Sequence, residues 1–189
     1  MPLPSFLGPL VPLPLPAAPL LRFAGPIGGA AASANLNLSV EAQMGNNWCW
    51  AATSKSVSAF FDPASPWTQC GIAAACLGGQ CCVAPAPCDV PFALEIALAV
   101  TGNLQGAPQQ GSDSRANVQG EIDGGRPVCC HIAWSADSGH FVAISGYDWN
   151  TDDVFVEDPL YGSQTVPYAG FVSAYRGSGS WDYTYLTQQ

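Results

Sequence analysis

One stretch constrains this chain more than any other: residues 43–61, with the sequence QMGNNWCWAATSKSVSAFF. A single cysteine, Cys49, stands between two tryptophans at the start of a segment whose composition favours a helix. Asn46 and Asn47 precede it and are typical helix-capping residues. Asp62-Pro63 closes the segment, because the residue before a proline avoids the helical conformation. We therefore expect Cys49 at a helix N-terminus, where the partial positive charge favours the nucleophilic thiolate.

A thiolate nucleophile needs a base, a group that orients the base, and donors for an oxyanion. His140 opens an apolar, strand-like block, and Asp158 ends a second such block just before Pro159. Gln43 lies six residues before Cys49 and can offer its side-chain amide to an oxyanion. Cysteine, histidine and aspartate in this order form a constellation, so we predict Cys49 as nucleophile, His140 as base and Asp158 as its orienting group.

Nearby residues of the same types receive other interpretations. The other histidine, His131, follows two cysteines in a predicted strand, and we interpret it as structural. Trp48 and Trp50 are expected to pack against the helix environment and not to form a substrate platform. The alternative carboxylates are Asp137 and Asp148.

These motifs together resemble the papain-like cysteine peptidases over residues 39–170. The resemblance rests on Gln43, Cys49-Trp50-Ala51, Gly139-His140-Phe141-Val142, Gly146-Tyr147 and Asp158-Pro159. The aspartate in the third position is similar to the compact bacterial branch, which includes bacteriocin-leader peptidase domains and staphopain-like or effector proteases. Papain has Asn followed by Ser-Trp at this place. A carboxylate can also orient an imidazole, and Tyr161 is the candidate to replace the shielding tryptophan.

The resemblance implies an α+β papain-like fold, with an N-terminal helical part carrying Cys49 and a C-terminal antiparallel sheet carrying His140 and Asp158. It implies hydrolysis of peptide bonds through a Cys-His-Asp triad and a thioester acyl-enzyme, with Gln43 as oxyanion donor and with no cofactor or metal. Two alternatives stay open. One is a cell-wall peptide amidase or transferase on the same scaffold, and the other is an inactive, exported, disulfide-rich binding module.

The pattern of predicted elements is also that of an α+β domain, with helices first and antiparallel strands later. After the first helix, further helices are expected at residues 68–76, 91–100 and 114–123. The middle one could equally be a strand, since its apolar residues alternate, but Ala, Leu and Glu favour a helix. Strands are expected at residues 128–134, 140–147, 154–158, 164–168 and 181–187.

Charge excludes some classes of partner. Five Lys and Arg residues against 14 Asp and Glu give a net charge of −9, so the chain has no basic track for nucleic acid. Anionic membrane surfaces are disfavoured for the same reason, and no apolar run reaches the roughly 18 residues of a membrane span. We expect a monomer that acts on a peptide or protein substrate.

Eight cysteines are too many for an ordinary cytosolic enzyme of this size. Seven remain without Cys49, and their spacing contains no C-x-x-C pair, so disulfides are favoured over zinc within residues 70–88. At least one further cysteine must stay unpaired. These cysteines predict a secreted or exported protein, although no export signal is evident. The connectivity stays open among Cys70, Cys76, Cys81, Cys82, Cys88, Cys129 and Cys130.

Residues 1–38 differ in composition from the rest and are rich in Pro, Ala and Gly. Eight prolines within residues 1–26 exclude a regular helix and favour polyproline II. We interpret residues 1–38 as a disordered leader, or alternatively as a pro-segment that covers the active site until it is cut. Residues 39–189 form the predicted peptidase domain.

Overall fold

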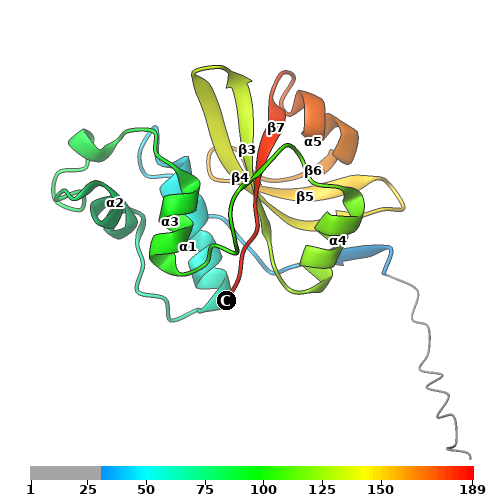
Figure 1. The fold of residues 1–189 in the computed structure, drawn as a ribbon, viewed down its shortest axis with the longest axis horizontal. Coiled ribbons are helices and arrows are strands. Elements are labelled where there is room, and N and C mark those ends of the chain that lie inside the picture. Colours follow the sequence, from blue (N-terminus) through cyan, green and yellow to red (C-terminus); the bar gives the residue numbers. More distant parts are fainter. Residues whose placement is uncertain (1–30) are drawn as a thin grey trace, which may run out of the picture. The chain divides into compact units, whose positions relative to one another are not determined.

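The computed structural model describes residues 31–189, and the predictions for residues 1–30 lie outside this range. The described part is an α+β domain, as predicted (Figure 1). Its helices are α1 (Cys49–Phe61), α2 (Gln69–Leu77), α3 (Leu94–Thr101), α4 (Arg115–Asp123) and α5 (Tyr168–Ala174), with a 3-10 turn η1 (Ala86–Cys88). Its strands are β1 (Ser33–Asn35), β2 (Gln109–Gln110), β3 (Val128–Ser135), β4 (Ser138–Asp148), β5 (Asp153–Asp158), β6 (Gly162–Pro167) and β7 (Ser180–Tyr185).

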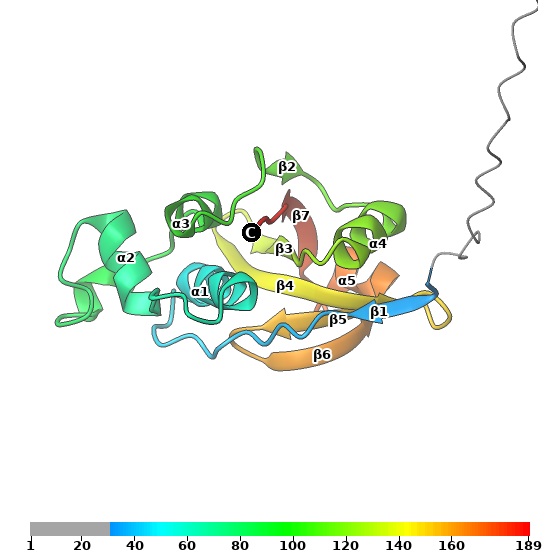
Figure 2. The same ribbon diagram turned by 90° about the horizontal axis from the view of Figure 1, so that it is seen from below.

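The strands form one antiparallel sheet with the order β2-β7-β3-β4-β5-β6. β1 pairs with the C-terminal end of β4, beyond the residues of β4 that pair with β3. The hairpin of β3 and β4 sets Ile132 opposite His140, and the next hairpin leads from β4 to Asp158 at the end of β5. Figure 2 shows α1 lying along one side of β4, so the nucleophile's helix and the strand of His140 are neighbours.

The central strands β3 and β4 are buried on both faces of the sheet, and each face belongs to a separate hydrophobic core. Successive residues of a strand point to opposite faces. Cys129 accordingly joins the core beneath α1, α2 and α3, whereas Cys130 joins the core beneath α4 and α5. Ala143 of β4 also faces the first core, and its neighbours on the strand face the second. A strand that is buried on both faces has a nearly continuous apolar sequence, as residues 141–144 of β4 do.

Helix α1 is enclosed by its neighbours and not merely laid on the surface. It packs against α2, α3 and β4, and its small residues let these elements approach closely. Trp48 and Trp50, at its start, are almost fully buried. Both tryptophans therefore pack inside the domain, as expected, and Trp50 also borders a pocket.

The other predicted helices are present, with boundary shifts of a few residues. Thr68 and Ser114 cap α2 and α4 by accepting hydrogen bonds from the backbone three residues later. Residues 91–100 are helical, as expected, but α3 begins only at Leu94. The strand expected to end at Tyr168 ends one residue earlier, where α5 begins. The sequence patterns did not predict α5, β1 or β2.

The N-terminal part of the described range is integrated into the sheet. Ser33–Asn35 pair with Gly146–Asp148, and the Leu36 N–H donates to the Ser145 carbonyl at 2.7 Å. Leu38 is 6% exposed and belongs to the first core. The folded domain thus begins within the range that composition assigned to the leader. Among residues 31–189, no helix has the length and apolarity to cross a membrane.

Two disulfides stabilise the segment between α1 and α3, as the cysteine spacing predicted. They join Cys70 to Cys82 and Cys81 to Cys88. The segment between α2 and α3 contains only the short turn η1, so the disulfides hold a region with little regular structure. The free cysteines of the described range are Cys49, Cys76, Cys129 and Cys130.

Candidate active site

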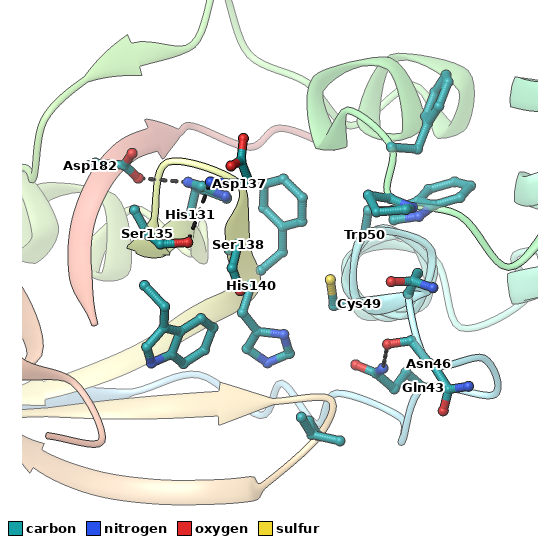
Figure 3. A pocket seen from close by; sticks show the side chains of 18 of the residues that line it. Gln43, Asn46, Cys49, Trp50, His131, Ser135, Asp137, Ser138, His140 and Asp182 are labelled. Carbon is teal, nitrogen blue, oxygen red and sulfur yellow. Dashed lines mark hydrogen bonds and ion pairs between the residues drawn. The ribbon is translucent and has the colours of Figure 1, made fainter. Parts of the chain in front are cut away.

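Cys49 is the first residue of α1 and faces a pocket of about 1070 Å³. The pocket lies between the helical half and the sheet, and His140 of β4 lines it from the opposite side (Figure 3). Cys49 is 9% exposed, so its sulfur is sheltered from solvent but borders the pocket. Because the first N–H groups of a helix have no partner within the helix, the backbone around Cys49 also supplies free donors.

His140 and Asp158 form a buried pair. The His140 Nε2 atom lies 2.7 Å from the Asp158 Oδ1 atom, and their side chains are 5% and 0% exposed. Because Nε2 is engaged with the carboxylate, Nδ1 is the ring nitrogen available to Cys49. The predicted nucleophile, base and orienting carboxylate are therefore brought into one site.

Asp158 is fixed on both of its carboxylate oxygens. Its Oδ1 also accepts hydrogen bonds from the backbone N–H groups of Leu160, at 2.7 Å, and Tyr161, at 3.0 Å. Its Oδ2 accepts one from the Tyr175 hydroxyl at 2.8 Å. The Tyr175 oxygen in turn accepts from the Gln164 amide at 3.0 Å. Neither the position nor the charge of this carboxylate depends on a single contact.

The surroundings of His140 and Asp158 favour the charged forms of both side chains. Burial by itself would lower the pKa of His140, but its interactions with Asp158 and Cys49 outweigh burial and raise that pKa from 6.5 to about 9. Burial by itself would raise the pKa of Asp158, but the hydrogen bonds from His140, Leu160 and Tyr175 hold it below its ordinary value. An imidazolium beside a carboxylate is the state that this geometry stabilises at neutral pH.

Two aromatic side chains flank the imidazole. The ring of Trp134, from β3, lies 5.6 Å from that of His140 between centroids, and the ring of Tyr161 lies edge-on at 6.2 Å. The guanidinium of Arg176 stacks over Tyr161 at 3.7 Å. Tyr161 thus occupies the neighbourhood expected for it, and Trp134 provides a second aromatic wall that the sequence patterns did not indicate.

Gln43 lies beside Cys49 on the wall of the pocket. Its Nε2 donates to the carbonyls of Gly45, at 2.9 Å, and Asn46, at 2.8 Å. Its Oε1 is buried and has no hydrogen-bond partner among the described residues. The Gln43 backbone N–H donates to the Pro159 carbonyl at 2.9 Å, which ties this segment to the turn after Asp158. Both amide hydrogens are therefore engaged within the turn that precedes Cys49.

The expected helix capping by Asn46 and Asn47 is wrong. Trp48 is the residue that precedes α1, and no side chain caps this helix. The two asparagines instead lie in the turn before it, where their backbone N–H groups donate to the carboxylate of Asp89, at 3.0 and 2.7 Å. An acidic side chain far along the chain thus satisfies this turn, and local capping rules cannot anticipate such a partner.

The remaining free thiols are poor candidates for a nucleophile. Burial raises the pKa of Cys129 to about 12 and holds that of Cys130 well above its ordinary value. Cys76 is half-buried on α2, and burial raises its pKa as well. Cys49 is therefore distinguished from the others by its place in the pocket and by the imidazole opposite it.

His131 also lines the pocket, and its Nδ1 lies 2.6 Å from the Asp182 Oδ1 atom. Its ring packs against Phe141 with centroids 4.9 Å apart. Asp137 lines the pocket too, whereas Asp148 has its hydrogen bonds with the turn at Asn150. Asp158, and neither of these alternatives, is the carboxylate that contacts His140.

Three residues of the site had no sequence signal that single motifs could reveal. Trp134 follows from strand pairing, because the β3–β4 hairpin places Ala133 and Ile132, the two residues before it, opposite Gly139 and His140. Tyr175 lies 17 residues after Asp158 and reaches it only because α5 packs back on the sheet. Asp89 lies 42 residues after Asn47 and contacts the turn before the nucleophile only through this long-range pairing.

Comparison with known proteins gives a family match and a likeness to solved structures. The model of the Peptidase_C39-like family matches residues 35–185, which is most of the chain. A crystal structure of the Pseudomonas avirulence protein AvrPphB superposes with a TM-score of 0.43 and 14% identity, covering 84% of this chain and 97% of that one. The search of curated proteins gives no match. The family match spans the whole site from Gln43 to Asp158, and the chain therefore belongs to the Peptidase_C39-like family.

Proposed function

We propose that this cysteine peptidase hydrolyses peptide bonds through a triad of Cys49, His140 and Asp158 and a thioester acyl-enzyme. The observation that carries the proposal is the buried His140–Asp158 pair, with 2.7 Å between Nε2 and Oδ1, set across the pocket from a cysteine that begins a buried helix. A thiol, an imidazole and a carboxylate in this relation have the parts that nucleophilic acyl transfer requires.

In the first half-reaction, the Cys49 sulfur attacks the substrate carbonyl carbon, and the electrons of the carbonyl π bond move to its oxygen. When the tetrahedral intermediate collapses, the proton on His140 Nδ1 passes to the leaving amine. This leaves a thioester on Cys49 and a neutral imidazole. Asp158 keeps the ring in place throughout, because its Oδ1 accepts from Nε2.

In the second half-reaction, water attacks the thioester. His140 Nδ1 takes a proton from that water, the C–S bond breaks, and the carboxylic acid product leaves. The sulfur and the imidazolium are restored as the starting pair. The pKa of His140, raised to about 9, supports this cycle because the protonated ring is available to the leaving amine at neutral pH.

The oxyanion of each tetrahedral intermediate needs donors. The backbone N–H of Cys49, in the first turn of α1, is one such donor. Gln43 is the second in this proposal. Its two amide hydrogens are engaged with the Gly45 and Asn46 carbonyls, so donation to the oxyanion requires that one of these bonds be exchanged when substrate binds.

We place the protein in an oxidising compartment. The two disulfides support this, since such bonds persist outside the cytosol and hold a segment of little regular structure. The substrate is a peptide or protein that occupies the pocket between helices and sheet.

The test compares Cys49→Ala with Cys76→Ala, which removes another free thiol on the helical side. We expect the first variant to lose hydrolysis of casein and labelling by iodoacetamide at Cys49, with its circular dichroism unchanged. The second should keep hydrolysis. A Cys49→Ala variant with full activity would contradict the proposal. Cleavage of peptidoglycan fragments with no cleavage of casein would favour the amidase instead.

A further inference from the structure

We propose that residues 88–90, anchored by the Cys81–Cys88 disulfide, are a positioning element for the nucleophile and that Asp89 is its central residue. The inference rests on the proposed role of Cys49. It concerns a segment that neither donates to the triad nor touches it. The segment acts through the turn formed by residues 45–48, which leads directly into Cys49.

The carboxylate of Asp89 holds the backbone of this turn. Its Oδ2 accepts from the Asn46 N–H at 3.0 Å, and its Oδ1 accepts from the Asn47 N–H at 2.7 Å. The Asn47 side chain returns a hydrogen bond from Nδ2 to the Asp89 carbonyl at 2.9 Å. Two consecutive backbone donors that point at one carboxylate fix the direction of the chain just before the nucleophile.

The tryptophans on either side of Cys49 are held by the same segment. The Trp48 indole N–H donates to the Cys88 carbonyl at 2.7 Å, and the Trp50 indole N–H donates to the Val90 carbonyl at 3.1 Å. Three successive carbonyls, at residues 88, 89 and 90, therefore accept from the residues around the nucleophile.

The approach is too close for a side chain at Gly45. A Cβ atom at this position would lie 2.8 Å from the Asp89 Oδ1 atom and 3.0 Å from the Trp48 ring. A side chain at residue 45 would therefore force the carboxylate of Asp89 or the indole of Trp48 to shift. The turn and the segment at residues 88–90 are fitted to each other.

The disulfide explains why residues 88–90 can act as a fixed support. Cys88 is joined to Cys81, and both sulfurs belong to buried residues of the first core. Apart from η1, no regular structure holds the chain between α2 and α3. The second disulfide, between Cys70 and Cys82, joins α2 to the residue next to Cys81 and makes no bond to the supporting segment itself.

Because Asp89 acts through the backbone, its loss should change the reactivity of Cys49 more than substrate affinity. Asp89→Asn keeps the shape but replaces one acceptor by an amide donor, which faces a backbone N–H. We expect kcat to fall by about tenfold or more with KM within about twofold, since small displacements of a reacting group are costly. The second-order rate of Cys49 labelling by iodoacetamide should fall at least about fivefold for the same reason.

The matched control is Asp62→Asn, which removes the same charge at the other end of α1, where the side chain bonds only the nearby Ala64 N–H. It should leave kcat and the labelling rate unchanged. Gly45→Ala is the second variant and should lower both rates through the clash with Asp89. Wild-type rates in Asp89→Asn or in Gly45→Ala, with circular dichroism that shows a folded protein, would overturn the proposal.

Two double variants test whether the Cys81–Cys88 disulfide supports the nucleophile. The first carries Cys81→Ser and Cys88→Ser together, and the second carries Cys70→Ser and Cys82→Ser together. We expect the first pair to lower the labelling rate of Cys49 well below that of the second, measured at a temperature where both remain folded. Equal rates in the two pairs would overturn it. The labelling rate needs no substrate. A wild-type protein that labels rapidly but cleaves no peptide would therefore reject the proposed function and still test this inference.

Discussion

Replacing Asp158 by Asn separates the charge of the triad carboxylate from its role in orientation. An amide oxygen in the place of Oδ1 can still accept from His140 Nε2 and from the N–H groups of Leu160 and Tyr161. The amide nitrogen then takes the place of Oδ2 and can donate to the Tyr175 oxygen. The hydrogen-bond geometry is thus nearly conserved, and only the negative charge is lost.

The expected size of the effect follows from His140. The rise of its pKa from 6.5 to about 9 corresponds to about 3 kcal/mol in favour of the imidazolium, at 1.36 kcal/mol per pKa unit. Asp158 is the first of the groups that raise this pKa, and burial opposes the rise. Without the carboxylate charge, the pKa should therefore drop toward 6.5 or below, and the leaving amine loses its proton donor above that pH.

The assay is the pH dependence of kcat/KM with a fluorogenic peptide between pH 5 and 10. We expect the upper limb of the wild-type profile near pH 9 and that of Asp158→Asn below about pH 7. The deficit should grow with pH and reach about thirtyfold at pH 8 if the pKa falls to 6.5. NMR titration of the His140 ring, assigned with a His131→Gln variant, measures the same pKa directly. A deficit that is constant with pH would refute the electrostatic reasoning.

Three further predictions concern the support of the site and the sheet. Tyr175→Phe leaves the buried Asp158 Oδ2 without its donor and should lower the free energy of unfolding, measured in urea, by about 1.5–3 kcal/mol. The acid limb of the kcat/KM profile should also shift to higher pH. Gly146→Ala places a Cβ 2.5 Å from the Ala34 carbonyl oxygen and should lower the free energy of unfolding by about 1–3 kcal/mol. Hydrogen exchange should show that β1 loses protection in this variant. The control is Gly120→Ala, at an exposed position with no atom within 4 Å of the new Cβ, which should leave β1 protected. Because the pKa of His140 is raised, the stability that His140 contributes is complete below pH 6.5 and is lost as pH rises through about 9. Because the pKa of Asp158 is lowered, the stability that Asp158 contributes is present above pH 3.8 and is lost as pH falls below it. Wild type and His140→Gln should therefore differ most in melting temperature between about pH 4 and 6.5, and a difference that increases toward pH 9 would contradict the sign of the argument.

Much of the fold could be predicted from the sequence because its signals are local. The segment after Cys49 is rich in small helix-forming residues and ends at Asp62-Pro63, and the structure has α1 between these limits. Successive side chains of a strand alternate between the two faces of the sheet, and this pattern likewise depends only on residues adjacent in the sequence. By contrast, β1 is three residues long and is stabilised by pairing with β4, so its own composition carries little information.

The residues of the candidate site could be predicted where each lies in a distinctive local sequence. Those that act only through contacts with distant segments could not be predicted. Cys49, His140 and Asp158 each lie in a distinctive sequence setting; the fold brings Cys49 and His140 to one pocket and places Asp158 against the imidazole. Asp89 and Tyr175 lie in unremarkable sequence, and their importance arises from long-range contacts to the turn at Asn47 and to Asp158. The expected asparagine cap was wrong because α1 begins only after Trp48, and the two asparagines lie in a turn whose backbone N–H groups donate to the distant carboxylate of Asp89.

The opposite orientations of Cys129 and Cys130 have a consequence for how the protein reaches its native disulfides. Once β3 has joined the sheet, both thiols are withdrawn from solvent, one into each core, and neither can exchange with a cystine. In an unfolded chain the same thiols compete for every partner. Oxidation before the sheet forms should therefore trap scrambled isomers. Refolding that lets the hairpin of β3 and β4 close first, with oxidised glutathione added afterwards, should give a higher yield of active enzyme.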